Sequence, residues 1–138
     1  MRRITLTLAC ALTLLAVAQT AAALLAQPFE GTRWKVTVTP DDEAQRAGEK
    51  PFDDVLVFKG GKFTAEACTK YGFKPVEYKE ETTRGPVASF TAEPKSDKEG
   101  TAKWHGNISG SEMTGELTWT KLDGTVLNYT FKGERMAK

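Results

Sequence analysis

Apolar and polar residues alternate with a period of two over most of the chain between Phe52 and Phe131. The pattern is clearest from Thr101 to Phe131, where apolar or small residues occupy every second position in three runs. These are Ala102, Trp104, Gly106 and Ile108, then Met113, Gly115, Leu117 and Trp119, then Leu127, Tyr129 and Phe131. Successive side chains of a β-strand point to opposite faces of the sheet, so the alternation predicts strands with one apolar and one polar face.

Eight segments carry this strand signal, and short turns join most of them. They are Arg33–Thr39, Val55–Lys59, Lys62–Lys70, Pro75–Thr83, Val87–Glu93, Thr101–Ser109, Glu112–Lys121 and Thr125–Gly133. Gly60-Gly61 and Asp123-Gly124 predict two-residue hairpins of type I′, because these residues tolerate positive φ, and Gly110-Ser111 is similar. Short hairpins make neighbouring strands antiparallel. The sequence therefore predicts an all-β, eight-stranded, antiparallel up-and-down (meander) barrel that closes to bury its edges.

The connection between the first two predicted strands has helical signals. Thr39 is a suitable cap, Pro40 suits the first helical position, and Gly48 suits a left-handed stop, so one short helix of two turns is predicted here. The strand that follows, Val55–Phe58, is apolar on both faces. We therefore expect the helix to cover the outer face of that strand.

The predicted barrel interior is rich in aromatic and small side chains. From the earlier strands it receives Trp34, Val36, Val38, Phe63, Ala65, Ala67, Val76, Tyr78, Ala88, Phe90 and Ala92. Either Leu56 and Phe58 or Val55 and Val57 join this set, and the pattern does not decide between them. A barrel of eight strands is filled by its side chains or holds one small ligand.

Two functions follow from these alternatives. In the first, the interior binds a small apolar or amphipathic molecule, and the candidate ligand-binding residues are Tyr78, Phe90, Trp104, Leu117, Trp119 and Tyr129. In the second, the core is solid and the barrel acts through its surface as a protein-interaction or enzyme-inhibitor module, for example at the loop Pro40–Pro51.

The N-terminal segment has the pattern of a secretory signal peptide. Arg2 and Arg3 precede an apolar run, and small residues follow that allow cleavage after Ala23 or Ala26. Residues 1–26 are therefore expected to be removed, which leaves residues 27–138 as a single domain, secreted or periplasmic. No other apolar stretch approaches the length of a membrane span.

Removal of the signal peptide changes the charge and the cysteine content. Loss of Arg2 and Arg3 reduces the 19 basic residues to 17 against 18 acidic residues, and this balance argues against nucleic acid and anionic membranes as partners. Loss of Cys10 leaves Cys68 without a disulfide partner. Strand alternation places Cys68 on the outer face with Thr64 and Glu66, and we interpret it as a free, partly buried thiol.

The chain offers little that is typical of catalysis. The single histidine, His105, alternates with Trp104 and is expected to face solvent. No nucleophile motif, phosphate-binding glycine loop or Cys/His metal spacing occurs. The sequence therefore predicts a protein that is not an enzyme and holds no cofactor or metal. The expected partners are a small hydrophobic ligand or another protein.

The start and end of the predicted domain resemble those of lipocalins and related calycin barrels. In Phe29-Glu30-Gly31-Thr32-Arg33-Trp34, a glycine precedes a tryptophan on the first strand, and Arg135 follows the last strand. Two residues separate Gly31 from Trp34, where the family has one. The resemblance implies a calycin-like barrel in which Gly31, Trp34 and Arg135 close one end, with the arginine packed on the indole.

Overall fold

The structure is a computed structural model that describes residues 28–82 and 87–138. The expected signal peptide at residues 1–26 lies outside these ranges, as does Thr83, the last residue of the predicted strand Pro75–Thr83. None of the helices in the described ranges is long and apolar enough to cross a membrane.

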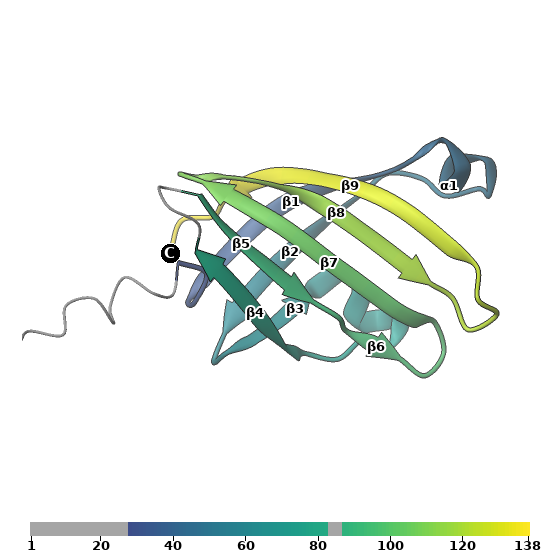
Figure 1. The fold of residues 1–138 in the computed structure, drawn as a ribbon, viewed down its shortest axis with the longest axis horizontal. Coiled ribbons are helices and arrows are strands. Elements are labelled where there is room, and N and C mark those ends of the chain that lie inside the picture. Colours follow the sequence, from purple (N-terminus) through teal and green to yellow (C-terminus); the bar gives the residue numbers. More distant parts are fainter. Residues whose placement is uncertain (1–27, 83–86) are drawn as a thin grey trace, which may run out of the picture.

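The described chain forms a closed β-barrel with very little helix (Figure 1). Its elements are β1 (Thr32–Pro40), α1 (Asp42–Arg46), β2 (Phe52–Lys59), β3 (Lys62–Ala65), the 3₁₀ helix η2 (Glu66–Tyr71), β4 (Val76–Thr82), β5 (Val87–Ala92), β6 (Lys95–Ser96), β7 (Gly100–Ser109), β8 (Glu112–Thr120) and β9 (Val126–Arg135).

Every pair of neighbouring strands is antiparallel, and the order in the sheet follows the order in the chain. The barrel closes where β1 pairs with β9, from Trp34 opposite Arg135 to Pro40 opposite Tyr129. β5 pairs directly with β7, and the two-residue β6 only extends the edge of β7. Eight strands therefore form the barrel wall, and the predicted antiparallel meander is confirmed.

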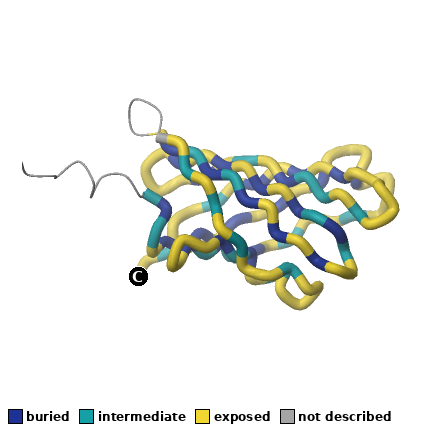
Figure 2. The backbone as a smooth tube through the Cα atoms, turned by 60° about the horizontal axis from the view of Figure 1, so that its bottom comes forward, coloured by how far each residue is buried: buried dark blue, intermediate teal, exposed yellow. Residues whose placement is uncertain are grey.

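Burial alternates along the strands as the sequence pattern predicts (Figure 2). On β1, Trp34, Val36 and Val38 are buried while the residues between them are exposed. On β2, the structure decides the alternative that the sequence left open. Leu56 and Phe58 face the interior, and Val55 and Val57 are only half-buried on the other face.

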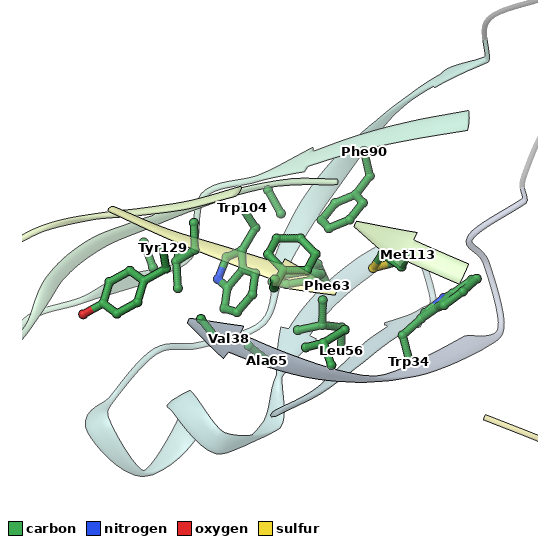
Figure 3. Packing of buried hydrophobic residues seen from close by; sticks show 14 of the residues in the cluster. Trp34, Val38, Leu56, Phe63, Ala65, Phe90, Trp104, Met113 and Tyr129 are labelled. Atoms are coloured by element: carbon green, nitrogen blue, oxygen red, sulfur yellow. The ribbon is translucent and has the colours of Figure 1, made fainter. Parts of the chain in front are cut away.

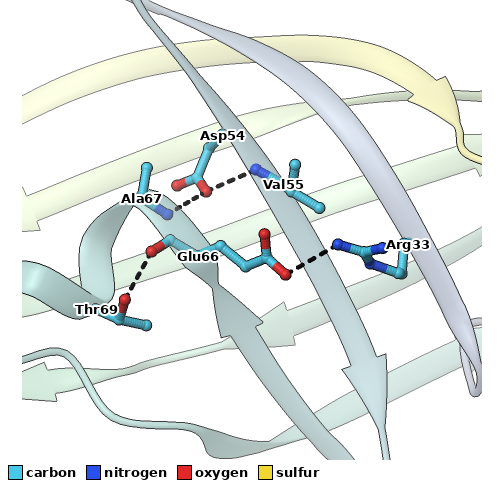
Figure 4. A network of polar contacts seen from close by, with 6 residues as sticks. All are labelled: Arg33, Asp54, Val55, Glu66, Ala67 and Thr69. Atoms are coloured by element: carbon cyan, nitrogen blue, oxygen red, sulfur yellow. Dashed lines mark hydrogen bonds and ion pairs between the residues drawn. The ribbon is translucent and has the colours of Figure 1, made fainter.

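One predicted strand is shorter than expected. The segment Lys62–Lys70 leaves the sheet after Ala65 and continues as η2. The Oδ1 atom of the buried Asp54 accepts hydrogen bonds from the N–H groups of Val55 (2.7 Å) and Ala67 (2.8 Å), which fixes the turn into the helix (Figure 4). The prediction that Cys68 lies on the outer face is therefore wrong, because the helix turns this thiol towards Asp54 and the core.

The predicted helix exists but differs in extent and in contacts. Thr39 and Pro40 belong to β1, and Asp41 caps α1 by accepting a hydrogen bond from the N–H group of Ala44 (2.8 Å). The helix packs against β9 and β1 at one end of the barrel (Figure 1). The expectation that it covers the outer face of β2 is therefore wrong. The reason is that β1 extends to Pro40, which carries the connection beyond the barrel wall.

The turns are partly as predicted. Gly60 and Gly61 both have positive φ (61° and 73°) and join Lys59 to its partner Lys62, as in a type I′ hairpin. The turn between β8 and β9 is longer than the predicted two residues. Gly124 alone has positive φ (88°), and its N–H group donates to the Lys121 carbonyl (3.0 Å), so the predicted type I′ turn is wrong there.

Candidate functional site

The barrel interior is divided into a packed half and a hollow half. The packed half lies at the end where β1 begins and β2 ends, and aromatic rings fill it (Figure 3). Phe58 is the centre of this cluster, with ring centroids 5.0 Å from Phe29, 4.8 Å from Phe90 and 5.4 Å from Phe63. The ring of Phe90 also occupies the space beside Gly106, so aromatic side chains pack closely in this half.

The opposite half contains a cavity of about 400 Å³. It opens between η2 and the loops that precede β2 and β7. Its lining consists of Glu49, Phe52, Asp53, Ala67, Cys68, Lys70, Tyr71, Phe73, Glu99, Ala102, Leu117, Trp119 and Tyr129. Five of these residues are aromatic, so the walls are mainly apolar and the charged residues belong to the cavity's open side. This size and composition are typical of small-molecule sites.

Three of the six candidate ligand-binding residues line this cavity. Leu117 and Trp119 reach it from β8, and Tyr129 reaches it from β9, because all three occupy inward positions near the open end of their strands. Their positions on one face follow from strand alternation, which the sequence made visible.

The other three candidates lie elsewhere. Phe90 and Trp104 are buried in the packed half, where Trp104 lies with its ring centroid 5.7 Å from that of Phe63. Tyr78 lies at the packed end and donates a hydrogen bond to Glu30 (2.8 Å). Strand alternation predicts which face a residue occupies but not its distance from each end of the barrel, so it could not separate these two groups.

The sequence reasoning missed Phe52, Tyr71 and Phe73. Phe52 is the first residue of β2, three positions before the predicted start of that strand. Tyr71 ends η2, and Gly72 (φ 90°) turns the chain so that Phe73 also reaches the cavity. The aromatic–Gly–aromatic triplet Tyr71-Gly72-Phe73 at the end of a strand-like segment was the available signal.

The residues on which the calycin resemblance rests lie at the packed end. Gly31 has positive φ (77°), and its N–H group donates to the Phe58 carbonyl (2.8 Å). Trp34 is fully buried and donates from Nε1 to Thr32 Oγ1 (2.8 Å). Arg135 is directly opposite Trp34 in the register of β1 and β9, and its side chain is exposed. In the described chain, the cation–π contacts are made by Lys70 on Tyr71 and by Lys121 on Trp119.

Two titratable groups pack together beside the cavity wall. Cys68 donates from its thiol to Asp54 Oδ2 (3.5 Å). Burial raises the pKa of the Asp54 carboxyl above its usual range, although its hydrogen bonds from Ala67 and Val55 oppose this shift. Burial, and then the nearby Asp54 charge, raise the pKa of Cys68 to about 12. The thiol is therefore protonated at neutral pH and is a weak nucleophile.

Two aromatic rings at the open side of the cavity have polar groups beside them. Trp119 donates from Nε1 to the Glu99 carbonyl (2.6 Å), and Lys121 Nζ lies 4.9 Å from the centroid of the indole. Burial, followed by the charge of Glu49 nearby, raises the pKa of the Tyr129 hydroxyl. The Trp119 ring is thus held in place before any ligand enters.

The structure does not bring Cys68 and His105 together. His105 is exposed on the outer face of β7, where its Nδ1 lies 3.2 Å from Thr91 Oγ1, whereas Cys68 faces the interior. Within the part of the chain that the structure describes, no group of three or more His, Cys, Asp or Glu side chains could hold a metal ion.

The cavity and the closed meander define the class of this protein as a small antiparallel β-barrel with one open and one packed end. No protein-family model matches the chain, and no curated protein or solved structure matches it significantly. Any function must therefore be argued from the geometry of the site itself.

Proposed function

We propose that the protein binds a small apolar or amphipathic molecule in the cavity at the open end of the barrel. The observation that carries this proposal is the division of the interior. Aromatic rings pack together in one half of the interior, while the other half contains a cavity of about 400 Å³ with mainly apolar walls. Burial of apolar ligand surface against such walls is favourable by roughly 25 cal/mol per Å² before the costs of association.

The cavity also suggests how the ligand is oriented. Leu117 and Ala102 form apolar surface deep in the site, and Glu49, Lys70 and Glu99 supply charged groups among the lining residues. An amphipathic molecule would bury its apolar part between the rings and leave its polar part near water. We expect binding rather than catalysis.

A titration of tryptophan fluorescence tests the proposal. Trp34 and Trp104 are fully buried, and Trp119 lines the cavity, so a bound molecule should change the emission of Trp119 first. We expect saturable changes with at least one of decanol, decanoate, retinol or haem. If none of these changes the emission, the proposal is wrong for this range of ligands.

A matched pair of variants locates the binding. Ala102→Leu places three more carbon atoms in the cavity and should weaken binding by about tenfold or more, because the ligand and the new side chain compete for the same space. Lys103→Leu adds an apolar side chain at the neighbouring, outward position of β7 and should leave affinity unchanged. Equal effects of the two variants would contradict an interior site.

A second candidate function is docking of a protein at the same end of the barrel. Tyr71, Leu122 and Val126 are large apolar residues with 50%, 68% and 45% exposure, and they lie on η2 and around the β8–β9 turn. A partner loop could cover them, as in the inhibitor hypothesis. Leu122→Asp combined with Val126→Asp should then abolish complex formation and leave the binding of decanol unchanged.

We also propose that the protein is exported after removal of residues 1–26. The support is the charged, apolar and small-residue order of that segment. Expression of the full chain in a bacterial host should place the product in the periplasm, with an N-terminus at Gln27 by mass spectrometry, or at Leu24 if cleavage follows Ala23 instead. An unprocessed chain in the cytoplasm would contradict this.

A further inference from the structure

One of the three indole groups has no hydrogen-bond acceptor. Trp34 Nε1 donates to Thr32 and Trp119 Nε1 donates to Glu99, but the fully buried Trp104 Nε1 has no partner among the described residues. A buried N–H group without an acceptor has lost its hydrogen bond to water and gained none in return. Native structures contain few such groups, and each one calls for an explanation.

The position of this donor connects it to the cavity. Ala102 precedes Trp104 by one pleat on the inner face of β7, and Leu117 is its direct partner on β8. Tyr129 is in turn the partner of Leu117 on β9, and all three neighbours line the cavity. Figure 3 shows the nitrogen of Trp104 on the side of the ring that faces Tyr129. The unpaired N–H group therefore lies beneath the cavity floor and points towards it.

The chemistry of the site limits what can accept this hydrogen bond. An indole N–H only donates, so the inner end of the ligand must carry an acceptor. Among the charged lining residues, the acidic Glu49, Asp53 and Glu99 outnumber the basic Lys70, and Asp54 lies behind Cys68 in the wall. A carboxylate ligand would be repelled by these groups and would lose its hydration in an apolar site. A neutral oxygen acceptor is not repelled by the acidic groups, and it loses less hydration than a carboxylate does.

We propose that the ligand of this cavity carries a neutral oxygen acceptor, such as a ketone or aldehyde carbonyl, at its inner end and that Trp104 Nε1 donates a hydrogen bond to it. The inference rests on the proposed function, because it assumes that the cavity binds a ligand. It adds the chemical class of that ligand and a specificity-determining residue. Small rearrangement of Leu117 or Tyr129 would open the floor to the indole.

Three probes of nearly the same shape test this proposal. 2-Acetylnaphthalene, 2-isopropenylnaphthalene and 2-naphthoate share one ring system and a planar substituent, and they differ in carrying a neutral acceptor, no acceptor or an anionic acceptor. Affinities are measured with the full chain by following tryptophan indole signals in ¹H–¹⁵N NMR spectra. We expect the ketone to bind roughly threefold to tenfold more tightly than the alkene, the range for one neutral hydrogen bond, and the carboxylate to bind more weakly than the ketone.

Variants assign the preference to the indole nitrogen. Trp104→Phe keeps an aromatic ring and removes the donor, so the ketone and the alkene should bind with about equal affinity. Trp34→Phe removes an indole N–H at the packed end, where it already has an acceptor, and should leave the ratio unchanged. Should Trp104→Phe fail to fold, the wild-type protein still gives an answer: the Trp104 Nε1–H signal should move downfield with the ketone and not with the alkene.

The outcomes separate the two proposals. Equal binding of ketone and alkene to the wild type, without a downfield shift at Trp104, would overturn the acceptor inference and leave the binding function standing. That result would mean that the indole N–H group stays buried without an acceptor among apolar side chains, including the rings of Phe63 and Phe131, whose centroids lie 5.7 Å and 5.3 Å from the indole. If none of the three probes changes the signal of Trp119 or Trp104, both proposals fail.

Discussion

Asp54 has two opposing effects on the stability of this protein. Its Oδ1 atom accepts two backbone N–H groups at the start of η2, which favours the fold, while burial of its charge is unfavourable. Because burial raises the pKa of Asp54, the folded protein binds this proton more tightly than the unfolded chain does. The contribution of Asp54 is therefore most favourable below the unfolded pKa of about 4 and is lost as pH rises through the folded pKa.

Asp54→Asn should remove this pH dependence. An asparagine Oδ1 can accept the same two backbone hydrogen bonds without a charge. We expect the variant to gain stability relative to wild type as pH increases above about 4, until the difference levels off above the folded pKa of Asp54. Urea unfolding between pH 3 and 8 measures this, and a constant difference across that range would contradict it.

Asp54→Ala is the matched control, because it removes both the charge and the acceptor. The N–H groups of Val55 and Ala67 then lose their partner, and we expect a loss of about 1–3 kcal/mol in the free energy of unfolding. The ion pair between Glu66 and Arg33 (3.1 Å) is about half exposed on both sides and cannot replace this contribution (Figure 4).

The reactivity of Cys68 provides a second test at the residue scale. With a pKa of about 12, its thiol carries little thiolate at pH 8. Iodoacetamide should therefore modify Cys68 at least about a hundredfold more slowly in the native protein than in denaturant. Mass spectrometry of the peptide that contains Cys68 measures both rates. Comparable rates would show that burial and Asp54 do not suppress the thiolate.

At the scale of the elements, close contacts between strands restrict which residues the wall can contain. Gly133 on β9 lies against β1, and a Cβ atom there would collide with the carbonyl oxygen of Lys35 and the Cα of Val36. Gly106 is similar, because the ring of Phe90 occupies the space that a Cβ would need. Gly133 thus allows β1 and β9 to approach each other closely, and Gly106 leaves space for the ring of Phe90.

Gly133→Ala should therefore destabilise the barrel by about 1–3 kcal/mol through overpacking, since backbone atoms have to move. Thr130→Ala, at an exposed position of the same strand, is the control and should change stability by less than about 0.5 kcal/mol. Thermal or urea unfolding compares the two. A tolerated Gly133→Ala would mean that β1 and β9 can separate without cost.

Sequence patterns were sufficient for most elements and failed where a tertiary contact intervened. The alternation in Lys62–Lys70 continues through Ala67, so a strand was the reasonable prediction. The bond from Ala67 to the distant Asp54 ends β3 early and creates η2. The same contact brings Cys68 to the cavity wall and allows Tyr71 to line it. No local pattern around Ala67 predicts its hydrogen bond to Asp54, because the two residues lie 13 positions apart in the chain.

At the scale of the whole molecule, the two ends of the barrel perform separate tasks. Phe29 closes the packed end. Its ring lies 5.3 Å from that of Phe90, and its N–H group donates to Glu80 (3.3 Å). Glu30 caps the Gly60-Gly61 turn through both backbone N–H groups. The cavity shares none of these residues, so stability and binding should respond to different substitutions.

Phe29→Ala should reduce the free energy of unfolding by about 3–5 kcal/mol and leave ligand affinity at the open end within about twofold of wild type. Phe29→Leu is a milder version in case the alanine variant does not fold. The measurements are urea unfolding and the fluorescence titration of Trp119. A loss of affinity that parallels the loss of stability would show that the ends are coupled.

The sequence by itself determined the class of fold, the antiparallel order of the strands and the face on which most residues lie. Alternation with a period of two and short glycine turns are local properties, and they encode these features directly. Only the tertiary structure decided where the rings fill the interior and where they leave a cavity. That outcome depends on the stagger of strands around the barrel and on contacts such as Asp54 with Ala67, which join residues far apart in the chain.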